Sequence, residues 1–130
     1  TPLVAIGPDV PVLEAVRRMA EAGVGAVLVM EDGALVGILT ERDYARKIVL
    51  QGRASATTPV RTIMTSPVKT VTPEQRAREC MQLMSDHRFR HLPVVEEGAV
   101  LGVISIGDLL KLVIEEQRAE IAALQSYIAS

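Results

Sequence analysis

The sequence predicts a mixed α/β (α+β) fold, with two β-α-β-β-α repeats packed sheet to sheet with pseudo-twofold symmetry and a long C-terminal helix. The first observation behind this prediction is an internal repeat. When the sequence is shifted by 65 residues, residues 6–49 align with residues 71–114 without a gap, and nine of the 44 aligned pairs are identical. Chance would give about two or three identities, at typical residue frequencies of roughly 5–7%. The second observation is that both copies show the same order of strand and helix patterns, as expected for a duplicated unit.

Each copy begins with a short apolar strand, at residues 4–6 and 70–71. A helix follows, because apolar residues recur at steps of three and four along one face. These residues are Leu13, Val16, Met19 and Ala20 in the first copy, and Ala77, Cys80, Met81 and Met84 in the second. Pro11 suits the first helical turn of the first copy, and residues 72–75 can cap the helix of the second.

Two apolar runs around an acidic-glycine turn then predict a hairpin in each copy, at residues 26–39 and 92–104. A second helix comes next. In the first copy it covers residues 41–50 and ends near Gly52, and in the second copy it continues toward Ile128.

These patterns divide the chain into repeat 1 at residues 1–52, a linker at 53–64, repeat 2 at 65–116 and a helical extension at 117–130. The end of the linker, residues 60–64, predicts a short helical turn. A repeat of about 45 residues buries little apolar surface alone. We therefore expect the two sheets to pack together and to leave two related clefts where the repeats meet.

The composition argues against several functions. The formal net charge is −2 and only three residues are aromatic, which disfavours nucleic-acid binding. No apolar run is long enough to cross a bilayer, and residues 1–4 lack the pattern of a signal peptide. Cys80 is the single cysteine, which favours a reducing compartment and a cytoplasmic location. Because the chain does not begin with methionine, we expect it to be a trimmed form or a fragment.

Both hairpins end in one short motif, at residues 37–43 and 102–108. The motif is Gly, two apolar residues, Ser or Thr, two variable residues and Asp. Taken alone, Ser/Thr-x-x-Asp predicts a helix cap, with Thr40 and Ser105 as N-cap residues and Asp43 and Asp108 in the first turn. The N–H groups at such a helix start can also bind an anion. The two interpretations are compatible.

This motif, together with residues 90–95 (Arg-His-Leu-Pro-Val-Val) and 60–65, resembles the signature of the CBS domain. The whole chain is similar to a tandem CBS pair, or Bateman module, of the small bacterial signal-transduction type. The resemblance implies a non-catalytic regulatory module that binds an adenine nucleotide, AMP, ADP, ATP or NAD(H), in the cleft between the repeats. It also implies that the motif Asp accepts the ribose hydroxyls, that the Ser or Thr lies near the ribose or phosphate, and that the protein is a homodimer.

The two clefts are expected to differ, because Arg88, Arg90 and His91 align with Gly23, Gly25 and Ala26. Arg42 aligns with Gly107, so repeat 1 supplies a further cation. The main ligand site is predicted to contain Lys69, Thr70, Val71, Arg88, Arg90, His91, Leu92, Pro93, Ser105, Asp108 and Arg42. The weaker site is predicted to contain Ile6, Gly25, Ala26, Thr40 and Asp43.

No arrangement of residues suggests catalysis, a catalytic cofactor or a metal site, and Cys80 is expected in the core. The C-terminal helix carries a narrow apolar stripe suited to another helix, formed by Ile114, Gln117, Ile121, Leu124 and Ile128. We favour a homodimer contact there over packing back onto the chain. Two alternatives to a nucleotide-dependent regulator remain open: a ligand-free structural or dimerisation module, and a regulatory fragment of a larger enzyme or transporter. S-adenosylmethionine is a further ligand candidate, and the downstream protein partner is not identified.

Overall fold

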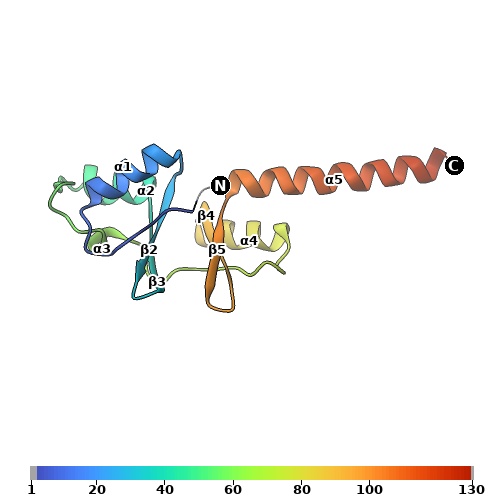
Figure 1. Cartoon of the computed structure of the whole chain (residues 1–130). Helices are drawn as coiled ribbons and strands as arrows, with labels where there is room; N and C mark the ends of the chain where they lie inside the picture. The colour runs from blue at the N-terminus through green and yellow to red at the C-terminus, as the bar shows by residue number, and fades with distance from the viewer. Residues whose placement is uncertain (1–2, 130) are drawn as a thin grey trace. The chain divides into compact units, whose positions relative to one another are not determined.

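The computed structural model describes residues 3–129 and divides into two compact units, one ending at Lys69 and the other beginning at Thr70 (Figure 1). Each unit has its own small sheet and its own aliphatic core. Thr1 and Pro2, from the stretch tested for a signal peptide, and Ser130, from the predicted extension, lie outside the described residues. The mixed fold and the long C-terminal helix that the sequence predicts are confirmed.

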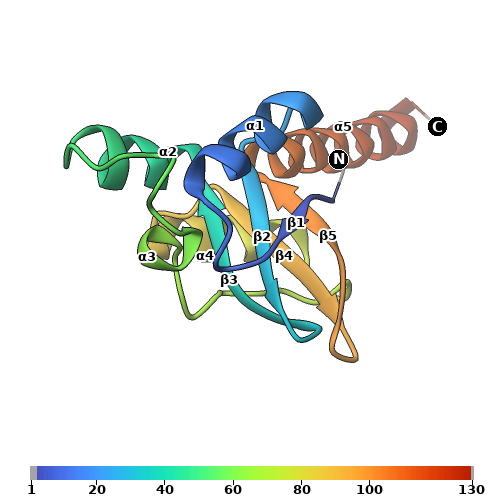
Figure 2. The ribbon, with the colours of Figure 1, turned by 60° about the vertical axis from the view of Figure 1, so that its left-hand side comes forward.

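The first unit follows the predicted order of strand, helix, hairpin and helix. Its elements are β1 (Ala5–Ile6), α1 (Val12–Ala22), β2 (Ala26–Glu31), β3 (Ala34–Thr40), α2 (Glu41–Tyr44), the π-helix η1 (Ala45–Val49) and α3 (Val60–Ile63). Strand β2 lies in the centre of the sheet, parallel to β1 and antiparallel to β3 (Figure 2). The hairpin turns at Asp32 and Gly33, which have φ of 51° and 78°. Two consecutive positive φ values are typical of the type I′ turn that suits twisted strands.

Residues 53–64, the predicted linker, lie within the first unit. Val60 and Ile63 are buried in its core beside α1 and β3. The Val12 N–H donates to the Thr58 carbonyl at 2.9 Å, and the Arg61 N–H donates to the Pro8 carbonyl at 2.7 Å. The polar residues 53–59 therefore lead into an apolar turn that completes the first core.

Thr65, which follows α3 in the chain, pairs with the edge strand β3 of the first sheet. The Thr65 N–H donates to the Ile38 carbonyl at 2.9 Å, and the Ile38 N–H donates to the Thr65 carbonyl at 3.1 Å. This antiparallel bridge places Met64 over Gly37 of β3. The motif glycine of the first repeat thus lies under a side chain from the end of the predicted linker.

The second unit has a two-stranded antiparallel sheet. Its elements are α4 (Ala77–His87), β4 (His91–Glu96), β5 (Ala99–Ser105) and α5 (Ile106–Ala129). The predicted strand at residues 70–71 is reduced to a single parallel bridge between Val71 and Val94. Glu97 and Gly98 form the same positive-φ turn as in the first hairpin. Cys80 is buried in the core together with Met84 and Leu92, as predicted.

Two helix predictions need correction. Helix α4 begins at Ala77 after Arg76, so residues 72–75 do not cap it. They form a separate turn, in which the Thr72 N–H donates to Gln75 Oε1 at 3.0 Å. The second helix of the first unit changes to a π-helix at Ala45, with the Leu50 N–H bonded to the Ala45 carbonyl at 3.0 Å. A π-turn of this kind inserts a residue relative to the α-helical register, and here it accompanies the burial of Ile48 in the core.

The close approach of Met64 to Gly37 predicts that alanine is tolerated unequally in the two motifs. A Cβ at Gly37 would lie 2.9 Å from Met64 Cγ and 3.2 Å from Met64 Cβ, whereas a Cβ at Gly102 would meet open space. We expect Gly37→Ala to lower the free energy of unfolding by about 1–3 kcal/mol through overpacking. Gly102→Ala, the matched control, should change it by less than about 0.5 kcal/mol. Urea denaturation of both variants measures this, and equal losses would contradict the packing difference.

Candidate functional site

Four of the predicted site residues, Thr40, Asp43, Ser105 and Asp108, lie where a hairpin strand runs directly into a helix. Strand β3 ends at Thr40 and α2 begins at the next residue, while β5 ends at Ser105 and α5 begins at Ile106. No loop separates strand from helix at either junction. The side chains of the last strand residue and of the first helical turn are therefore fixed by regular backbone on both sides.

A capping box closes both junctions, as predicted. In the second unit the Ser105 N–H donates to Asp108 Oδ2 at 3.0 Å, and the Asp108 N–H donates to Ser105 Oγ at 3.2 Å. In the first unit the corresponding bonds between Thr40 and Asp43 are both 3.1 Å. Each pair satisfies two backbone donors that the helix itself leaves without partners.

A backbone bond links each junction to the residue that precedes the first hairpin strand. The Ile106 N–H donates to the Arg90 carbonyl at 2.9 Å, and the Glu41 N–H donates to the Gly25 carbonyl at 3.1 Å. His91 pairs with Ser105 across the hairpin. The backbone of Arg90, His91 and Ser105 therefore lies close to Asp108 in the second unit, while the role of these residues in a ligand site stays a prediction.

Four further residues of the predicted main site, Thr70, Val71, Leu92 and Pro93, lie on neighbouring segments. The Val71 N–H donates to the Pro93 carbonyl at 3.0 Å, so the Thr70–Val71 segment runs along β4. The side chains of Val71, Leu92 and Pro93 are buried, whereas Thr70 is exposed. Any ligand contact from the buried residues would therefore have to use their backbone or the edges of their side chains.

The predicted residues of the weaker site all lie in the first unit. Ile6 and Ala26 are buried, and Gly25, Thr40 and Asp43 are half-buried. Of the main-site residues, Arg42 and Lys69 also belong to the first unit, where both are exposed. Their contribution to a ligand on the second unit stays a prediction.

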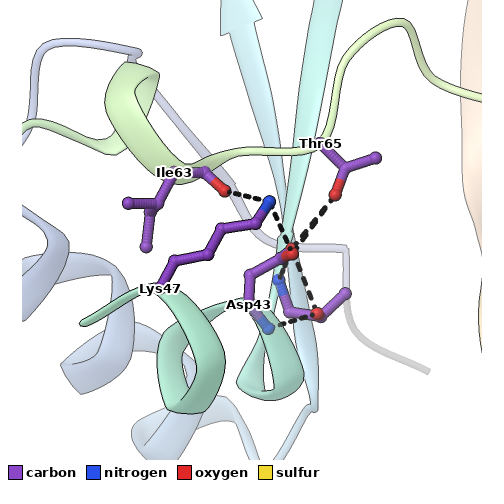
Figure 3. Close-up of polar contacts among 5 residues, drawn as sticks. Asp43, Lys47, Ile63 and Thr65 are labelled. Atoms are coloured by element: carbon purple, nitrogen blue, oxygen red, sulfur yellow. Dashed lines mark hydrogen bonds and ion pairs between the residues drawn. The ribbon is translucent and has the colours of Figure 1, made fainter. Parts of the chain in front are cut away.

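The Asp43 carboxylate is surrounded by donors from its own unit (Figure 3). Besides the Thr40 N–H, Asp43 Oδ2 receives the Thr40 hydroxyl at 3.1 Å. Asp43 Oδ1 receives the Thr65 hydroxyl at 3.2 Å and forms an ion pair with Lys47 Nζ at 3.1 Å. Lys47 Nζ also donates to the Ile63 carbonyl at 2.9 Å. An ionised carboxylate has about four acceptor positions. The donors from Thr40, Thr65 and Lys47 therefore account for the hydrogen bonds that Asp43 can accept.

Sequence reasoning missed Lys47 and Thr65 as partners of Asp43. The Asp43–Lys47 spacing of four residues on one helix was a readable signal, because such residues share a face. The contact from Thr65 had no local signal, since it depends on the bridge to Ile38. In the 65-residue alignment Lys47 corresponds to Leu112, so the second copy has no lysine at this position.

The Asp108 carboxylate has its pKa held below the usual value. The main cause is the hydrogen bond from the Ser105 backbone N–H, and the Ser105 hydroxyl adds to it, while partial burial acts in the opposite direction. Lys111, on the next turn of α5, lowers this pKa slightly further. Asp108 is therefore ionised at neutral pH, in the protonation state in which a carboxylate accepts hydrogen bonds.

Arg88 occupies a backbone position that favours glycine. It ends α4 in the left-handed region with φ of 58°, whereas Gly23 has φ of 66° at the aligned end of α1. For a residue with a Cβ, this conformation is less favourable by about 1–2 kcal/mol. The second repeat thus carries a cation where the first carries the less strained residue.

Other reactive groups in the described residues offer little chemistry. Burial raises the pKa of the Cys80 thiol, and the charge of Glu79 adds to this, so the thiol stays protonated. No cluster of three or more His, Cys, Asp or Glu residues suited to a metal ion occurs within residues 3–129. None of the helices in this part of the chain is long and apolar enough to span a membrane.

The chain is similar to known proteins over most of its length. The family profile described as CBS domain matches residues 1–50 and 60–115. The mitochondrial CBS domain-containing protein CBSX3 of Arabidopsis thaliana is 47% identical over 125 residues, which cover 92% of this chain and 61% of that relative. The chain thus spans about three fifths of the plant protein. The CBS domain-containing protein YhcV of Bacillus subtilis is 35% identical over 109 residues, which cover 84% of this chain and 77% of that protein.

Solved structures agree with these relatives. A putative signal-transduction protein with CBS domains from Burkholderia ambifaria superposes with a TM-score of 0.84 at 50% identity, over 90% of this chain and 85% of the other. A hexameric CBS-CP12 protein from bloom-forming cyanobacteria superposes with a TM-score of 0.79 at 27% identity, over 97% of this chain and 82% of the other.

The capping geometry predicts how the acidity of Asp108 responds to mutation. Ser105→Ala removes the hydroxyl but keeps the backbone N–H, so the pKa of Asp108 should rise and still remain below about 3.9, the usual value. Because the folded-state pKa is lowered, the stabilisation is complete above the unfolded-state pKa and is lost as the pH falls through the folded value. NMR titration of the Asp108 carboxyl measures the shift. A pKa unchanged in Ser105→Ala would show that the hydroxyl has no influence.

Proposed function

The chain belongs to the CBS-domain family, and we propose that it is a non-catalytic regulatory module that binds an adenine nucleotide. The pair of repeats and the similarity to signal-transduction proteins with CBS domains support a regulatory role. The proposed ligands are AMP, ADP, ATP and NAD(H), bound in the cleft expected between the repeats. The main site would be centred on the second unit.

The observation that carries this proposal is the junction between β5 and α5. Asp108 is an ionised carboxylate on the first turn of a helix, and the backbone of Arg90 and His91 lies next to this turn. A carboxylate can accept two ribose hydroxyls, while a helix start and nearby guanidinium groups attract phosphate. Sugar and phosphate of one nucleotide can therefore be bound by neighbouring residues.

The difference between the two junctions supports a strong site and a weak site. Asp43 already accepts hydrogen bonds from Thr40 and Thr65 and pairs with Lys47. A ribose bound there would have to displace these donors. The first unit also has Gly23, Gly25 and Ala26 at the positions of Arg88, Arg90 and His91, so it offers a phosphate fewer cations.

The adenine ring is proposed to lie along the Thr70–Val71 segment beside β4. Main-chain N–H and carbonyl groups at a strand edge can recognise the polar edge of the ring. Arg42 and Lys69, which both belong to the first unit, are proposed to contact the phosphate across the cleft. Such contacts would make nucleotide affinity depend on how the two repeats are arranged, and a ligand shifts an equilibrium only through such differential affinity.

The proposed assembly is a homodimer. The apolar stripe on α5 supports it, because this part of the helix is exposed in the single chain. A ligand-free dimerisation module is the competing function, and it would use the same helix while both ligand sites stay empty. A regulatory segment of a larger enzyme or transporter is a further alternative that is consistent with the partial coverage of the plant relative.

The proposal predicts nucleotide binding that depends on Asp108 far more than on Asp43. A ligand at 100 times its dissociation constant should raise the free energy of unfolding by about 2.7 kcal/mol. Thermal-shift measurements with AMP, ADP, ATP, NAD, NADH and S-adenosylmethionine identify the ligand. Calorimetric titration should then show at least about tenfold weaker binding for Asp108→Asn, since hydrogen bonds to a charged group are worth about 1.5–3 kcal/mol each.

Asp43→Asn is the matched control, because it changes the same motif residue in the other repeat. Its main-site affinity should differ from that of the unmodified chain by less than about threefold, well under 1.4 kcal/mol. No stabilisation by any member of the ligand panel would leave the ligand-free module as the better account. Equal losses in the two variants would contradict the proposed asymmetry.

Arg88 is predicted to lower the stability of the fold and to raise its affinity for nucleotide. Arg88→Gly removes the left-handed strain of about 1–2 kcal/mol but makes the unfolded chain more flexible, for a net gain of about 0.5–1 kcal/mol in unfolding free energy. It should also weaken nucleotide binding by about tenfold or more, the value of one charged hydrogen bond. Arg88→Ala is the control that removes the charge and keeps the strain. Denaturant unfolding and calorimetry measure the two effects, and full affinity in both variants would exclude Arg88 from the site.

A further inference from the structure

Most of helix α5 is not used by the core of its own unit. Leu109 is buried and Val113 is half-buried near its start, but every residue from Ile114 to Ile128 is exposed. The later part of α5 extends beyond α4 and the β4–β5 hairpin of its unit (Figure 1). Several of these residues are large and apolar. Leu110, Ile114, Ile121, Leu124 and Ile128 are between 45% and 81% exposed.

The exposed apolar residues form one straight stripe. Together with Gln117 they recur at alternating steps of four and three residues, so that every second residue lies seven positions further along the helix, a period of 3.5. This period is the heptad repeat of a left-handed coiled coil, in which two helices keep one seam in contact. We call the six residues Leu110, Ile114, Gln117, Ile121, Leu124 and Ile128 the α5 seam.

The types of residue in the seam favour one arrangement of two helices. The heptad a positions are Ile114, Ile121 and Ile128. The d positions are Leu110, Gln117 and Leu124. Isoleucine at a and leucine at d favour a parallel two-stranded coiled coil, because β-branched side chains pack well at the a layer of a parallel dimer.

Gln117 favours a single axial alignment of the two helices in this arrangement. In a parallel in-register pair, Gln117 faces Gln117 of the second copy, and the two amides can hydrogen-bond to each other. Any shifted register places an amide against an apolar side chain and leaves its hydrogen bonds unmade. A single polar layer of this kind specifies register and orientation at some cost in stability.

The charged residues beside the seam argue against the antiparallel alternative. An antiparallel pair that buries all six seam residues has its twofold axis at the level of Ala119. That axis brings Arg118 beside Arg118 of the second copy, and Glu120 beside Glu116 and Glu120 of the second copy. Like charges at such positions are destabilising. The parallel in-register pair brings Arg118 beside Val113 and Glu120 beside Gln125, and so avoids these contacts.

We propose that the α5 seam binds the same seam of a second copy as a parallel, in-register, two-stranded coiled coil. The inference deepens the proposed homodimer by naming its contact, and it is independent of nucleotide binding. The seam spans about three heptads, so dimerisation should depend on concentration, because short helices gain little stability of their own. The helix pair would place the carboxyl ends of both chains together.

Cysteine cross-linking tests the orientation of the two helices. Leu124→Cys places a thiol at a d position, where the two copies meet in the parallel pair, and mild oxidation should give a covalent dimer. Ala123→Cys is the matched control one residue away, on a side of the helix that faces away from the seam, and it should stay uncrosslinked. The unmodified chain is the blank, since its only cysteine, Cys80, is buried.

The antiparallel alternative gives a different pattern of cross-links. Leu124→Cys alone would not cross-link, whereas a mixture of Ile114→Cys and Leu124→Cys chains would. That pattern would overturn the proposal. Equal cross-linking of Leu124→Cys and Ala123→Cys would also overturn it, because the reaction would then reflect random collision.

Light scattering of the unmodified chain supplies a test without cysteines. A dimer is expected at tens of micromolar, and Ile121→Asp should convert it to a monomer, while Ala122→Asp, which points away from the seam, should leave it dimeric. If the Ile121→Asp variant is still a dimer, the proposed pairing of the α5 helices is wrong, but the broader homodimer proposal is unaffected. A monomeric unmodified chain would overturn both, without affecting the nucleotide site.

Discussion

The geometry of both units depends on a carboxylate that caps a helix at the point where a strand ends. Asp43 and Asp108 accept the backbone N–H of Thr40 and Ser105, three residues earlier, and so close the strand onto the helix without a loop. The helix start is held a second time by the carbonyl of Gly25 or Arg90. Strand, helix and the segment before the hairpin therefore meet at one point. A ligand bound at this point contacts three segments of the chain at once.

The two copies use the same junction differently. In the first copy, residues from η1 and from the segment around the start of the predicted second repeat complete it. Thr65 and Lys47 occupy the Asp43 carboxylate, and Met64 covers Gly37. In the second copy the position of Lys47 is taken by Leu112, and a Cβ at Gly102 would meet open space. The first junction thus has contacts from Lys47, Met64 and Thr65, and the second repeat has Arg88 and Arg90 just before its hairpin.

The fold was predictable from the sequence where the determinants are local. The acidic-glycine turns, the apolar period of the helices and the Ser/Thr-x-x-Asp caps each depend on residues a few positions apart, and the structure has all of them. The resemblance to CBS domains added the proposed ligand and the proposed role of Asp108. Neither the ligand nor that role follows from composition or periodicity.

The features that the sequence did not reveal depend on contacts between distant segments. Thr65 reaches Asp43 only because its backbone pairs with Ile38. The polar residues 53–59 indicated a linker, yet Val60 and Ile63 immediately after them fill the first core. The π-helix at Ala45 likewise has no local signal, and in it Ile48 is buried while the Lys47 ammonium group contacts both Asp43 and the Ile63 carbonyl.

The unequal completion of the two junctions suggests how a signal can arise. Contacts made by the chain itself have the same strength whether or not a ligand is present, so the proposed weaker site at the first junction should respond less to nucleotide. At the second junction, the hydrogen bonds of a ligand would add to those of the cap, and their free energy depends on ligand concentration. A pair of units that respond unequally can change its arrangement with nucleotide level, provided that the two arrangements differ in affinity. The asymmetry produced by Lys47 and Thr65 on one side and by Arg88 and Arg90 on the other is therefore what the proposed sensor would require.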